Sequence, residues 1–296
     1  MKASYNKFLC VGLFLSLGMQ ASLNTAYALT LDEIKSKAGE LQKQRKDTIS
    51  EIEKKAKPAG LIAYSDEEEA AIGRQIAGNL LGAAPLVKDN ALQKYVNNVG
   101  RWVASQSERP DLAWHFGVIS SSDINAFAAP GGYIFIMLGL YQIFGDESEL
   151  AGVLAHEIGH VIKKHHLKIL QQSQLVDLGG KVLTKEVGEN NEIRNLIGNG
   201  AEIVARSLDK NAEFEADRIA VVLATRAGYE AYGLPQVLQE IGHVGGDDRV
   251  DLLFKTHPHP DERLTHLGNA MDQRFDSVKG KALPGRLYKI NVSGKK

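Results

Sequence analysis

Two histidines with a glutamate directly after the first lie in the stretch AHEIGH, at a spacing that suits a metal ion. Residues i and i+4 of an α-helix share a face, so His156 and His160 can present two imidazole nitrogens to one ion. Glu157 is near enough to reach a water molecule on that ion. This HExxH arrangement is typical of zinc hydrolases. In these enzymes the glutamate accepts a proton as zinc-bound water attacks a carbonyl and then passes it to the leaving amine.

A catalytic zinc needs a third protein ligand, which must come from elsewhere in the chain. The only cysteine is Cys10, so this ligand is a histidine, an aspartate or a glutamate. The best candidate lies in EFEAD, where Glu213 and Asp217 are again i and i+4 among apolar residues. Such a pair is costly to bury unless Glu213 binds the metal and Asp217 accepts a hydrogen bond from a ligand histidine. Glu202 and Asp209 are also within range, so spacing alone leaves the third ligand open.

The two histidines that follow the motif are expected to lie outside the site. His165 and His166 come after Lys163 and Lys164, and this run indicates the solvent-exposed end of the same helix. Glu215, between the two acids of EFEAD, is expected to be solvated. Of the four histidines in this part of the chain, only the two in AHEIGH are therefore predicted to be ligands.

The helix that carries the motif is predicted to begin at Glu147 and to be part of the core. Apolar residues such as Leu154 and Ile158 surround the motif at helical spacing. This pattern disfavours the alternative of a solvated helix with incidental histidines. A second helix is predicted from Asp209 to Ala227, with Gly228 as the residue that ends it.

Two strands and two further helices are predicted before the motif. The segments 114–119 and 133–136 are rich in aromatic and β-branched residues, which indicates strands, and the PGG between them forces a turn. A capping-box sequence opens a helix over 65–81, and another helix is predicted over 90–106. The pattern indicates one α+β domain that is mostly helical and has a small β-sheet.

The N-terminal residues predict a secretory signal peptide that is cleaved after Ala28. Two lysines precede a short apolar run (8–19), and the triplet AYA stands before the cleavage point. The alternative of a membrane anchor needs roughly 20 apolar residues, more than this run contains. A lipid anchor on Cys10 is disfavoured because Leu9 stands where a small residue is required.

The composition indicates a globular protein without an electrostatic signature for nucleic acid. The 296 residues are 44% hydrophobic and 24% charged, with a net charge of −1. A chain of this length and composition can bury a sizeable core. Neither nucleic acid nor an anionic membrane surface is expected as a partner, because both require an excess of basic residues.

The order of the motifs resembles the CAAX-prenyl-protease/HtpX family of zinc metallopeptidases, in particular its soluble, exported BepA- and LoiP-like branch. Over residues 60–270, the matching segments are AIGRQIA, INAFAAPGGYIFIMLGL, ELAGVLAHEIGHV, ExEAD and THPHPDERL. The resemblance implies a zincin-like fold and one Zn²⁺ per chain, held by His156, His160 and Glu213. It also implies that Glu157 is the general base and that Asp217 supports the site.

The resemblance points to three further residues. Asn125 and Ala126 match a family segment that implies an edge strand to which an extended peptide adds; an ordinary strand–turn–strand is the alternative. His257 matches a histidine that, in relatives of this kind, is able to occupy the open position of zinc and keep the enzyme latent. Stabilisation of the oxyanion and an ordinary loop histidine are the alternatives for His257.

One departure from the family pattern lies next to the third ligand. Many relatives have Ser-Arg where this chain has Asp209-Lys210. Asp209 can still cap the helix, so the departure affects local contacts of the missing arginine rather than metal binding. No later apolar run reaches transmembrane length, so the prenylated substrates of the membrane-embedded relatives are not expected here.

The chain is expected to have four parts. These are a signal peptide (1–28), a polar N-terminal helix (29–58), a zinc metallopeptidase domain (59–270) and a C-terminal tail (271–296). Within the domain, the Gly- and Asn-containing stretch 171–207 is expected to be a tolerant connection, with a lid as the alternative.

Three functions are consistent with the sequence. The first is a periplasmic zinc endopeptidase that removes misfolded or stalled envelope proteins, with unfolded polypeptides as substrates and the outer-membrane assembly machinery as a candidate partner. The second is a chaperone or assembly factor whose zinc is occluded by His257. The third is an exported helical scaffold without metal.

Overall fold

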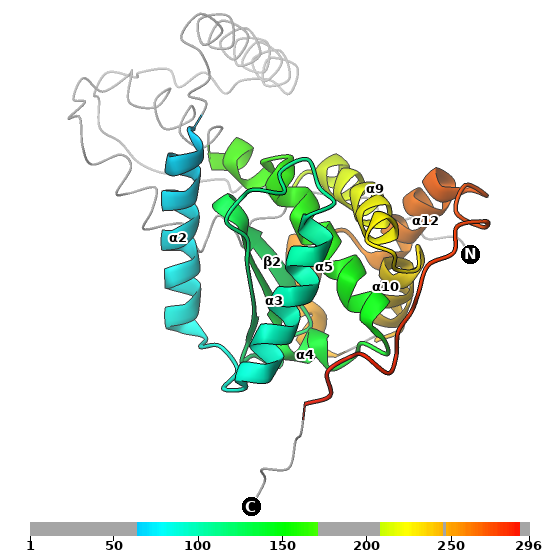
Figure 1. Ribbon diagram of the computed structural model, residues 1–296, viewed down its shortest axis with the longest axis horizontal. Coiled ribbons are helices and arrows are strands. Elements are labelled where there is room, and N and C mark those ends of the chain that lie inside the picture. Colours follow the sequence, from blue (N-terminus) through cyan, green and yellow to red (C-terminus); the bar gives the residue numbers. More distant parts are fainter. Residues whose placement is uncertain (1–63, 171–207, 245–246, 291–296) are drawn as a thin grey trace, which may run out of the picture. The chain divides into compact units, whose positions relative to one another are not determined.

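The computed structural model describes residues 64–170, 208–244 and 247–290 (Figure 1). The predicted signal peptide, the polar helix over 29–58 and the connection over 171–207 lie outside these residues. Within the described residues, no helix is both long enough and apolar enough to cross a bilayer.

The sheet has three strands in the order β1-β3-β2. β1 (His115–Ile119) and β3 (Tyr133–Met137) confirm the two predicted strands and pair in parallel. β2 (Ala126–Ala129) pairs with β3 antiparallel and is an edge strand. Between β2 and β3 lies the turn Pro130–Gly132, in which Gly131 and Gly132 have φ of 74° and 90°. A glycine is needed at both positions because other residues rarely adopt positive φ.

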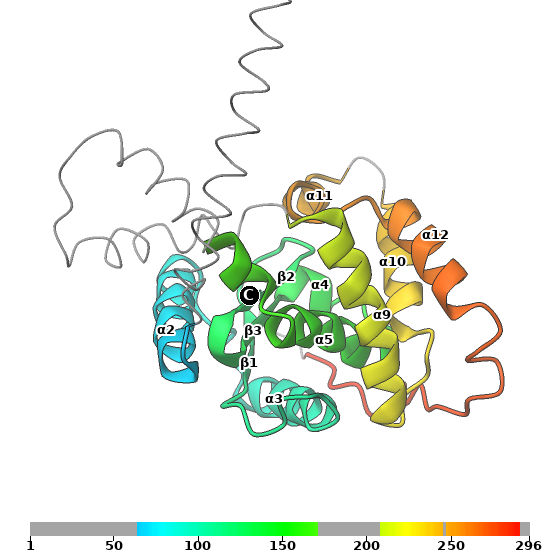
Figure 2. The ribbon, with the colours of Figure 1, turned by 90° about the horizontal axis from the view of Figure 1, so that it is seen from above.

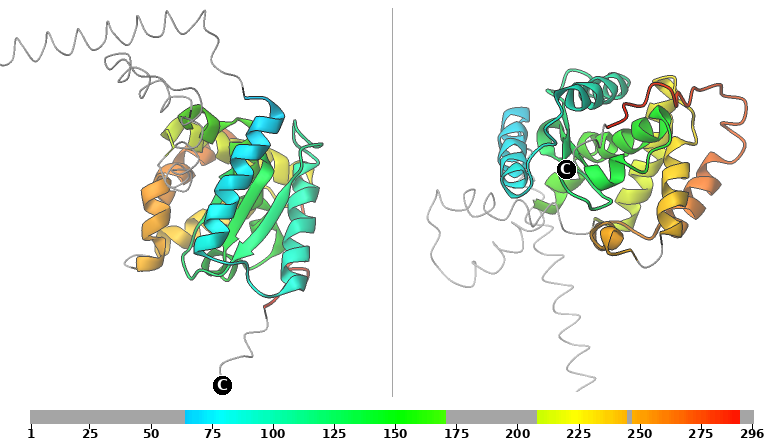
Figure 3. Two further views of the ribbon diagram at one scale, coloured as in Figure 1. Left: turned by 90° about the vertical axis from the view of Figure 1, so that its left-hand side faces the viewer. Right: turned by 90° about the horizontal axis from the view of Figure 1, so that it is seen from below.

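Two helices lie close to their predicted positions and pack against the sheet. α2 (Asp66–Ala83) begins with the predicted capping box on Ser65. It packs on one face of the sheet (Figure 3). There its isoleucines belong to one apolar cluster with Phe127 and Phe135. α3 (Asn90–Ala104) begins at the N-cap Asp89 and packs against β1.

The motif helix α5 (Glu147–Ile162) is the central element of the domain. It follows the short α4 (Leu138–Tyr141), and the N-cap Asp146 accepts hydrogen bonds from two of its first amides. Figure 2 shows α5 between the sheet and helices α9, α10 and α12. Because α5 is enclosed on both sides, fifteen of its sixteen residues are buried.

α9 (Lys210–Arg226) packs closely along α5 and confirms the predicted second helix. The approach depends on small residues: a Cβ on Gly159 would lie 3.3 Å from the Cα of Ala216. The remaining elements were not predicted from periodicity. They are α10 (Gly233–His243), the 3-10 turn η2 (Asp248–Val250), α11 (Asp251–Thr256) and α12 (Pro260–Met271).

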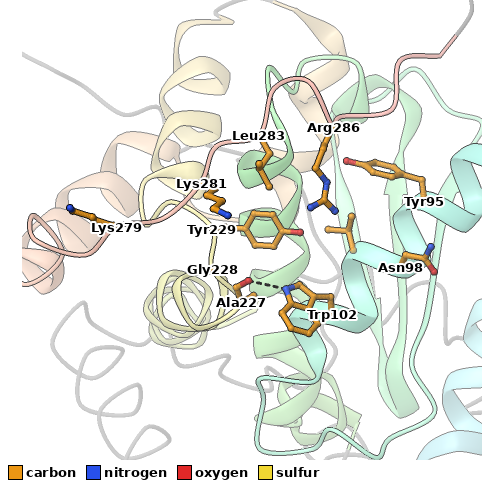
Figure 4. A pocket seen from close by; sticks show the side chains of 11 residues that line it. Tyr95, Asn98, Trp102, Ala227, Gly228, Tyr229, Lys279, Lys281, Leu283 and Arg286 are labelled. Carbon is orange, nitrogen blue, oxygen red and sulfur yellow. Dashed lines mark hydrogen bonds between the residues drawn. The ribbon is translucent and has the colours of Figure 1, made fainter.

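Residues 279–286 lie beside α3 and the residues that follow α9 (Figure 4). The carbonyl of Ala282 also accepts a hydrogen bond from the amide of Ser148, at the start of α5. These C-terminal residues border a cavity of about 540 Å³. Beside it, the buried Glu147 carboxylate accepts hydrogen bonds from the hydroxyls of Tyr95 (2.8 Å) and Tyr229 (2.9 Å). It also pairs with Arg286 at 3.1 Å. These contacts tie the start of the motif helix to three separate segments of the chain.

Glu149→Gln should remove part of the pH dependence of stability. Burial raises the pKa of Glu149 from 4.5 to about 7, so the folded protein holds a proton that the unfolded chain releases. The stability that this proton adds is complete below pH 4.5 and is lost as the pH rises through about 7. The loss is on the order of 2–3 kcal/mol in the wild type and absent in the variant. Urea unfolding of both proteins with a chelator, at about pH 5 and about pH 8.5, measures it; parallel profiles would contradict the assignment.

Candidate metal centre

Four side chains from three helical segments bring metal-ligand atoms together. One donor atom from each of His156, His160, Glu213 and His257 lies within 4.8 Å of all the others. The two histidine Nε2 atoms are 3.0 Å apart, and they lie 3.7 Å and 3.5 Å from the Glu213 carboxylate oxygens. Ligand atoms around a tetrahedral zinc are about 3.4 Å apart, given bonds of about 2.0–2.1 Å. The spacing of these donors therefore fits one such ion.

The carboxylate of Glu213 gives an independent test of that fit. Glu213 is fully buried, and neither oxygen has a hydrogen-bond partner among the residues that the structure describes. Burial raises the pKa of Glu213 well above its ordinary value. A buried carboxylate without a partner is costly, whereas a cation among these donors would satisfy both oxygens. The donor set of imidazoles and one carboxylate suits zinc.

The imidazoles are in the protonation state that metal binding requires. Burial and the charge of Arg263 lower the pKa of His156, although Asp217 acts to raise it. Burial and the neighbouring histidines lower the pKa of His160 well below its ordinary value. Both rings are therefore neutral near pH 7, and each has one nitrogen lone pair available. Neutral imidazole is the form of histidine that binds metals.

Asp217 holds the ring of His156, and an arginine holds Asp217. The His156 Nδ1 lies 2.9 Å from an Asp217 oxygen, so Nδ1–H donates and Nε2 is left with its lone pair toward the donor cluster. Arg263 donates to both Asp217 oxygens, at 3.0 Å and 2.6 Å. Burial acts to raise the pKa of Asp217, but Arg263 and His156 outweigh it and keep the pKa below its usual range. Asp217 therefore accepts a hydrogen bond from a histidine of the cluster.

Arg263 is the residue of this site that sequence reasoning missed. It lies in the first turn of α12, inside the segment THPHPDERL, and its side chain is only 4% exposed. A single arginine has no spacing that marks it as functional. Its importance comes from burial against Asp217, which depends on how α12 packs on α9. The one available signal was that Asp217, a buried acid, needed a basic partner.

Glu157 faces a small cavity beside the donor cluster. The glutamate is 3% exposed, and burial raises its pKa to about 8. The cavity has a volume of about 30 Å³ and is shared with His156, His257 and Arg263. The other residues that line it are apolar: Ala126, Leu140, Val153, Leu234, Val237, Leu238, Ile241 and Leu253. The glutamate and the cluster therefore share one small, mostly apolar compartment.

His257 lies at the C-terminal end of α11 and contributes to the same cluster. Its Nε2 is 3.7 Å from a Glu213 oxygen, and its ring is 10% exposed. Its Nδ1 is 2.9 Å from the hydroxyl of Thr256. The chain thus brings His257 to the cluster from a segment about a hundred residues after the motif helix.

The expectation that His165 and His166 are exposed was wrong. They are only 4% and 7% exposed. α5 ends at Ile162, and the chain then turns at Lys164, which has a φ of 56°. This left-handed residue redirects the chain, so the helical residues that follow fold against the domain instead of extending into solvent. Periodicity cannot reveal such a turn, because lysine rarely adopts positive φ.

The other predicted site residues lie as follows. Asn125 is buried, and its side-chain oxygen accepts a hydrogen bond from the amide of Ala126, the first residue of edge strand β2. Asp209 caps α9 by accepting from the Asn211 amide at 2.7 Å, and it is absent from the donor cluster. Lys210 pairs with Glu262 of α12 at 2.8 Å. Glu202 lies outside the described residues.

Glu213→Gln tests two effects of the buried carboxylate: its destabilisation of the metal-free protein and its contribution to zinc binding. In a chelator the variant should be at least as stable as the wild type, because the unpartnered charge is gone. With zinc at 100 times its Kd, the wild type should gain about 2.7 kcal/mol and the variant far less. Thermal unfolding with and without zinc measures this, with Glu262→Gln as the control at a surface ion pair. An equal zinc response in all three proteins would contradict the role of Glu213.

Comparison with known proteins places the chain in a family. Residues 90–271 match the model of Peptidase family M48. The chain is 30% identical over 218 residues to the Beta-barrel assembly-enhancing protease of Yersinia pestis, covering 71% of this chain and 45% of the relative. The protein of that name from Escherichia coli (strain K12) is 30% identical over 215 residues, covering 70% and 44%. Metalloprotease YcaL of the same strain is 26% identical over 221 residues, covering 71% and 84%.

These matches confirm the family resemblance seen in the motifs. The chain spans less than half the length of the two assembly-enhancing proteases. The family match covers the motif helix, the glutamate helix and the segment of His257 and Arg263. Together with the cluster of His156, His160 and Glu213, it identifies the chain as a metallopeptidase that belongs to peptidase family M48.

Proposed function

We propose that the chain is a zinc endopeptidase of the bacterial periplasm that hydrolyses peptide bonds in misfolded or stalled exported proteins. The observation that carries the catalytic part is the fully buried Glu213 carboxylate, which has two neutral imidazoles beside it and no hydrogen-bond partner among the described residues. In this proposal His156, His160 and Glu213 hold one zinc ion per chain. Asp217, held by Arg263, orients the ring of His156.

Zinc, when bound, supplies Lewis acidity that activates water and polarises the carbonyl of the scissile peptide bond. Glu157 accepts a proton from the attacking water as its oxygen bonds to the carbonyl carbon. The same carboxyl then donates that proton to the amide nitrogen as the carbon–nitrogen bond breaks. The products are a new carboxyl terminus and a free amine. The apolar walls around Glu157 exclude bulk water from this proton transfer.

Edge strand β2 supports the proposal that substrates bind in an extended form. Main-chain pairing to an edge strand tolerates many sequences, which suits unfolded polypeptides. Ala126 begins this strand and also lines the cavity that contains Glu157, so a peptide paired there would pass close to the base. All four residues of β2 are buried. Peptide binding through Asn125 and Ala126 therefore requires this edge to become uncovered.

The cellular part of the proposal rests on the N-terminus and on the relatives. Residues 1–28 have the charge, apolar run and AYA triplet of a cleaved signal peptide. Two relatives carry the name Beta-barrel assembly-enhancing protease. We therefore include the outer-membrane assembly machinery as a candidate partner. The alignment covers less than half of each of these relatives. Contacts that they make through their unaligned parts are therefore not part of this proposal.

A second candidate function is a chaperone or assembly factor with a latent zinc site. Its support is the position of His257, whose Nε2 belongs to the same group of four donors. A zinc ion with four protein ligands lacks the open position that a catalytic site keeps. The buried edge of β2 points the same way, since a latent enzyme has no accessible substrate strand. Both functions can belong to one protein if His257 is displaced when substrate arrives.

Glu157→Gln should abolish peptide hydrolysis and leave zinc binding intact. The amide keeps the size of the side chain but cannot accept the proton, so cleavage of casein should fall by a factor of about 10² to 10⁴. Zinc content, measured on the same preparation, should remain at one ion per chain. Glu149→Gln, on the same helix but outside the cluster, is the control that keeps wild-type activity. Full activity of Glu157→Gln would contradict the role of Glu157 as the general base.

His257→Ala tests the latent state. If His257 is the fourth ligand, the variant should cleave casein several-fold faster than the wild type. X-ray absorption of the zinc-loaded proteins should then change from four protein ligands to three with a water. Unchanged coordination in the variant would rule out His257 as an occluding ligand.

A further inference from the structure

The second histidine of the motif has a partner on the side that faces away from the donor cluster. His160 Nδ1 lies 2.9 Å from His165 Nδ1, and both rings are buried. On the other side of the same ring, Nε2 is the atom that lies among the donors, 3.0 Å from the Nε2 of His156. His160 is therefore held between the cluster and a second imidazole.

The position of Nε2 decides how the protons are arranged in this pair. A ring nitrogen that faces a metal must present its lone pair, so the single proton of neutral His160 sits on Nδ1. His160 then donates, and His165 must accept through its own Nδ1. Neutral His165 consequently carries its proton on Nε2, which lies 3.4 Å from an oxygen of Glu215. The half-buried carboxylate of Glu215 accepts from it and ends the chain of contacts.

We propose that His165 is a positioning residue for the metal centre: it accepts the Nδ1–H of His160, fixes that ring in the tautomer that leaves Nε2 free, and is itself oriented by Glu215. This rests on the proposed function, because it takes His160 to be a zinc ligand. The two histidines of the motif are then held by different partners. A carboxylate holds His156, and an imidazole backed by a carboxylate holds His160.

The arrangement depends on two local features of the chain. The turn with positive φ at Lys164 brings His165 back over the end of α5. Glu215 lies on α9 between Glu213 and Asp217, so three acids within five consecutive residues serve the same centre from different directions. His166, the next residue, is also buried and its ring centroid is 5.8 Å from that of His160, but the two make no hydrogen bond. It provides a matched control.

Three variants test the proposal by zinc affinity, measured by competition with a chelator. His165→Phe keeps a buried ring but removes the acceptor, so zinc should bind 10- to 100-fold more weakly. His165→Asn places an oxygen close to the former Nδ1 and should restore affinity to within about threefold of wild type. His166→Phe should bind zinc as the wild type does. The Tm of each metal-free protein reports any loss of packing separately from the loss of affinity.

Three results would overturn the proposal. They are wild-type affinity in His165→Phe, equal weakening in His165→Phe and His166→Phe, and failure of the asparagine to restore affinity. If His165→Phe does not fold, ¹⁵N NMR of histidine-labelled, zinc-loaded wild type decides the question. The expected result is His160 protonated on Nδ1 and His165 protonated on Nε2. A proton on Nδ1 of His165 would contradict the proposal.

The experiment also separates this inference from the proposed function. A wild-type protein that binds no zinc, or an active Glu157→Gln, would refute the function itself. Zinc binding by the wild type and an inactive Glu157→Gln, combined with wild-type affinity in His165→Phe, would refute only the role of His165.

Discussion

A carboxylate buried without a hydrogen-bond partner is the constraint on which the rest of this structure depends. Glu213 is fully buried, and its ion-pair contacts within the described part of the chain are to the imidazoles of His156, His160 and His257. Burying such a group costs several kcal/mol unless a cation neutralises it. The fold therefore places metal ligands around a buried charge: α5 supplies two neutral imidazoles, α9 supplies the carboxylate, and the surrounding elements bury all three side chains.

Close packing of α5 and α9 brings these groups together, and the surrounding segments orient them. Gly159 allows the two helices to approach, and a Cβ at Gly152 would lie 2.6 Å from the Leu234 amide of α10. The sheet supports α5 from its other side (Figure 2). Arg263 reaches Asp217 from α12, and His257 reaches the cluster from α11. The centre is thus assembled from contacts that are distant in sequence, although its two histidines lie on one turn of a helix.

Sequence reasoning succeeded where local rules determine the outcome and failed where tertiary packing does. The helix that carries HExxH and the two strands follow from residue periodicity and type, and the Asp209 cap follows from N-cap preference; all are present. Two features could not be predicted in this way. The burial of His165 depends on a turn at a lysine with positive φ, and the role of Arg263 depends on where α12 packs. Neither feature leaves a periodic pattern in the chain.

The central claim is that His156, His160 and Glu213 bind one zinc ion. Anomalous diffraction at the zinc edge, from crystals of protein purified without added chelator, tests it most directly. We expect a single strong peak at about 2.0–2.2 Å from the Nε2 atoms of both histidines and from an oxygen of Glu213. No peak there in crystals soaked with zinc, or a peak held by other residues, would contradict it.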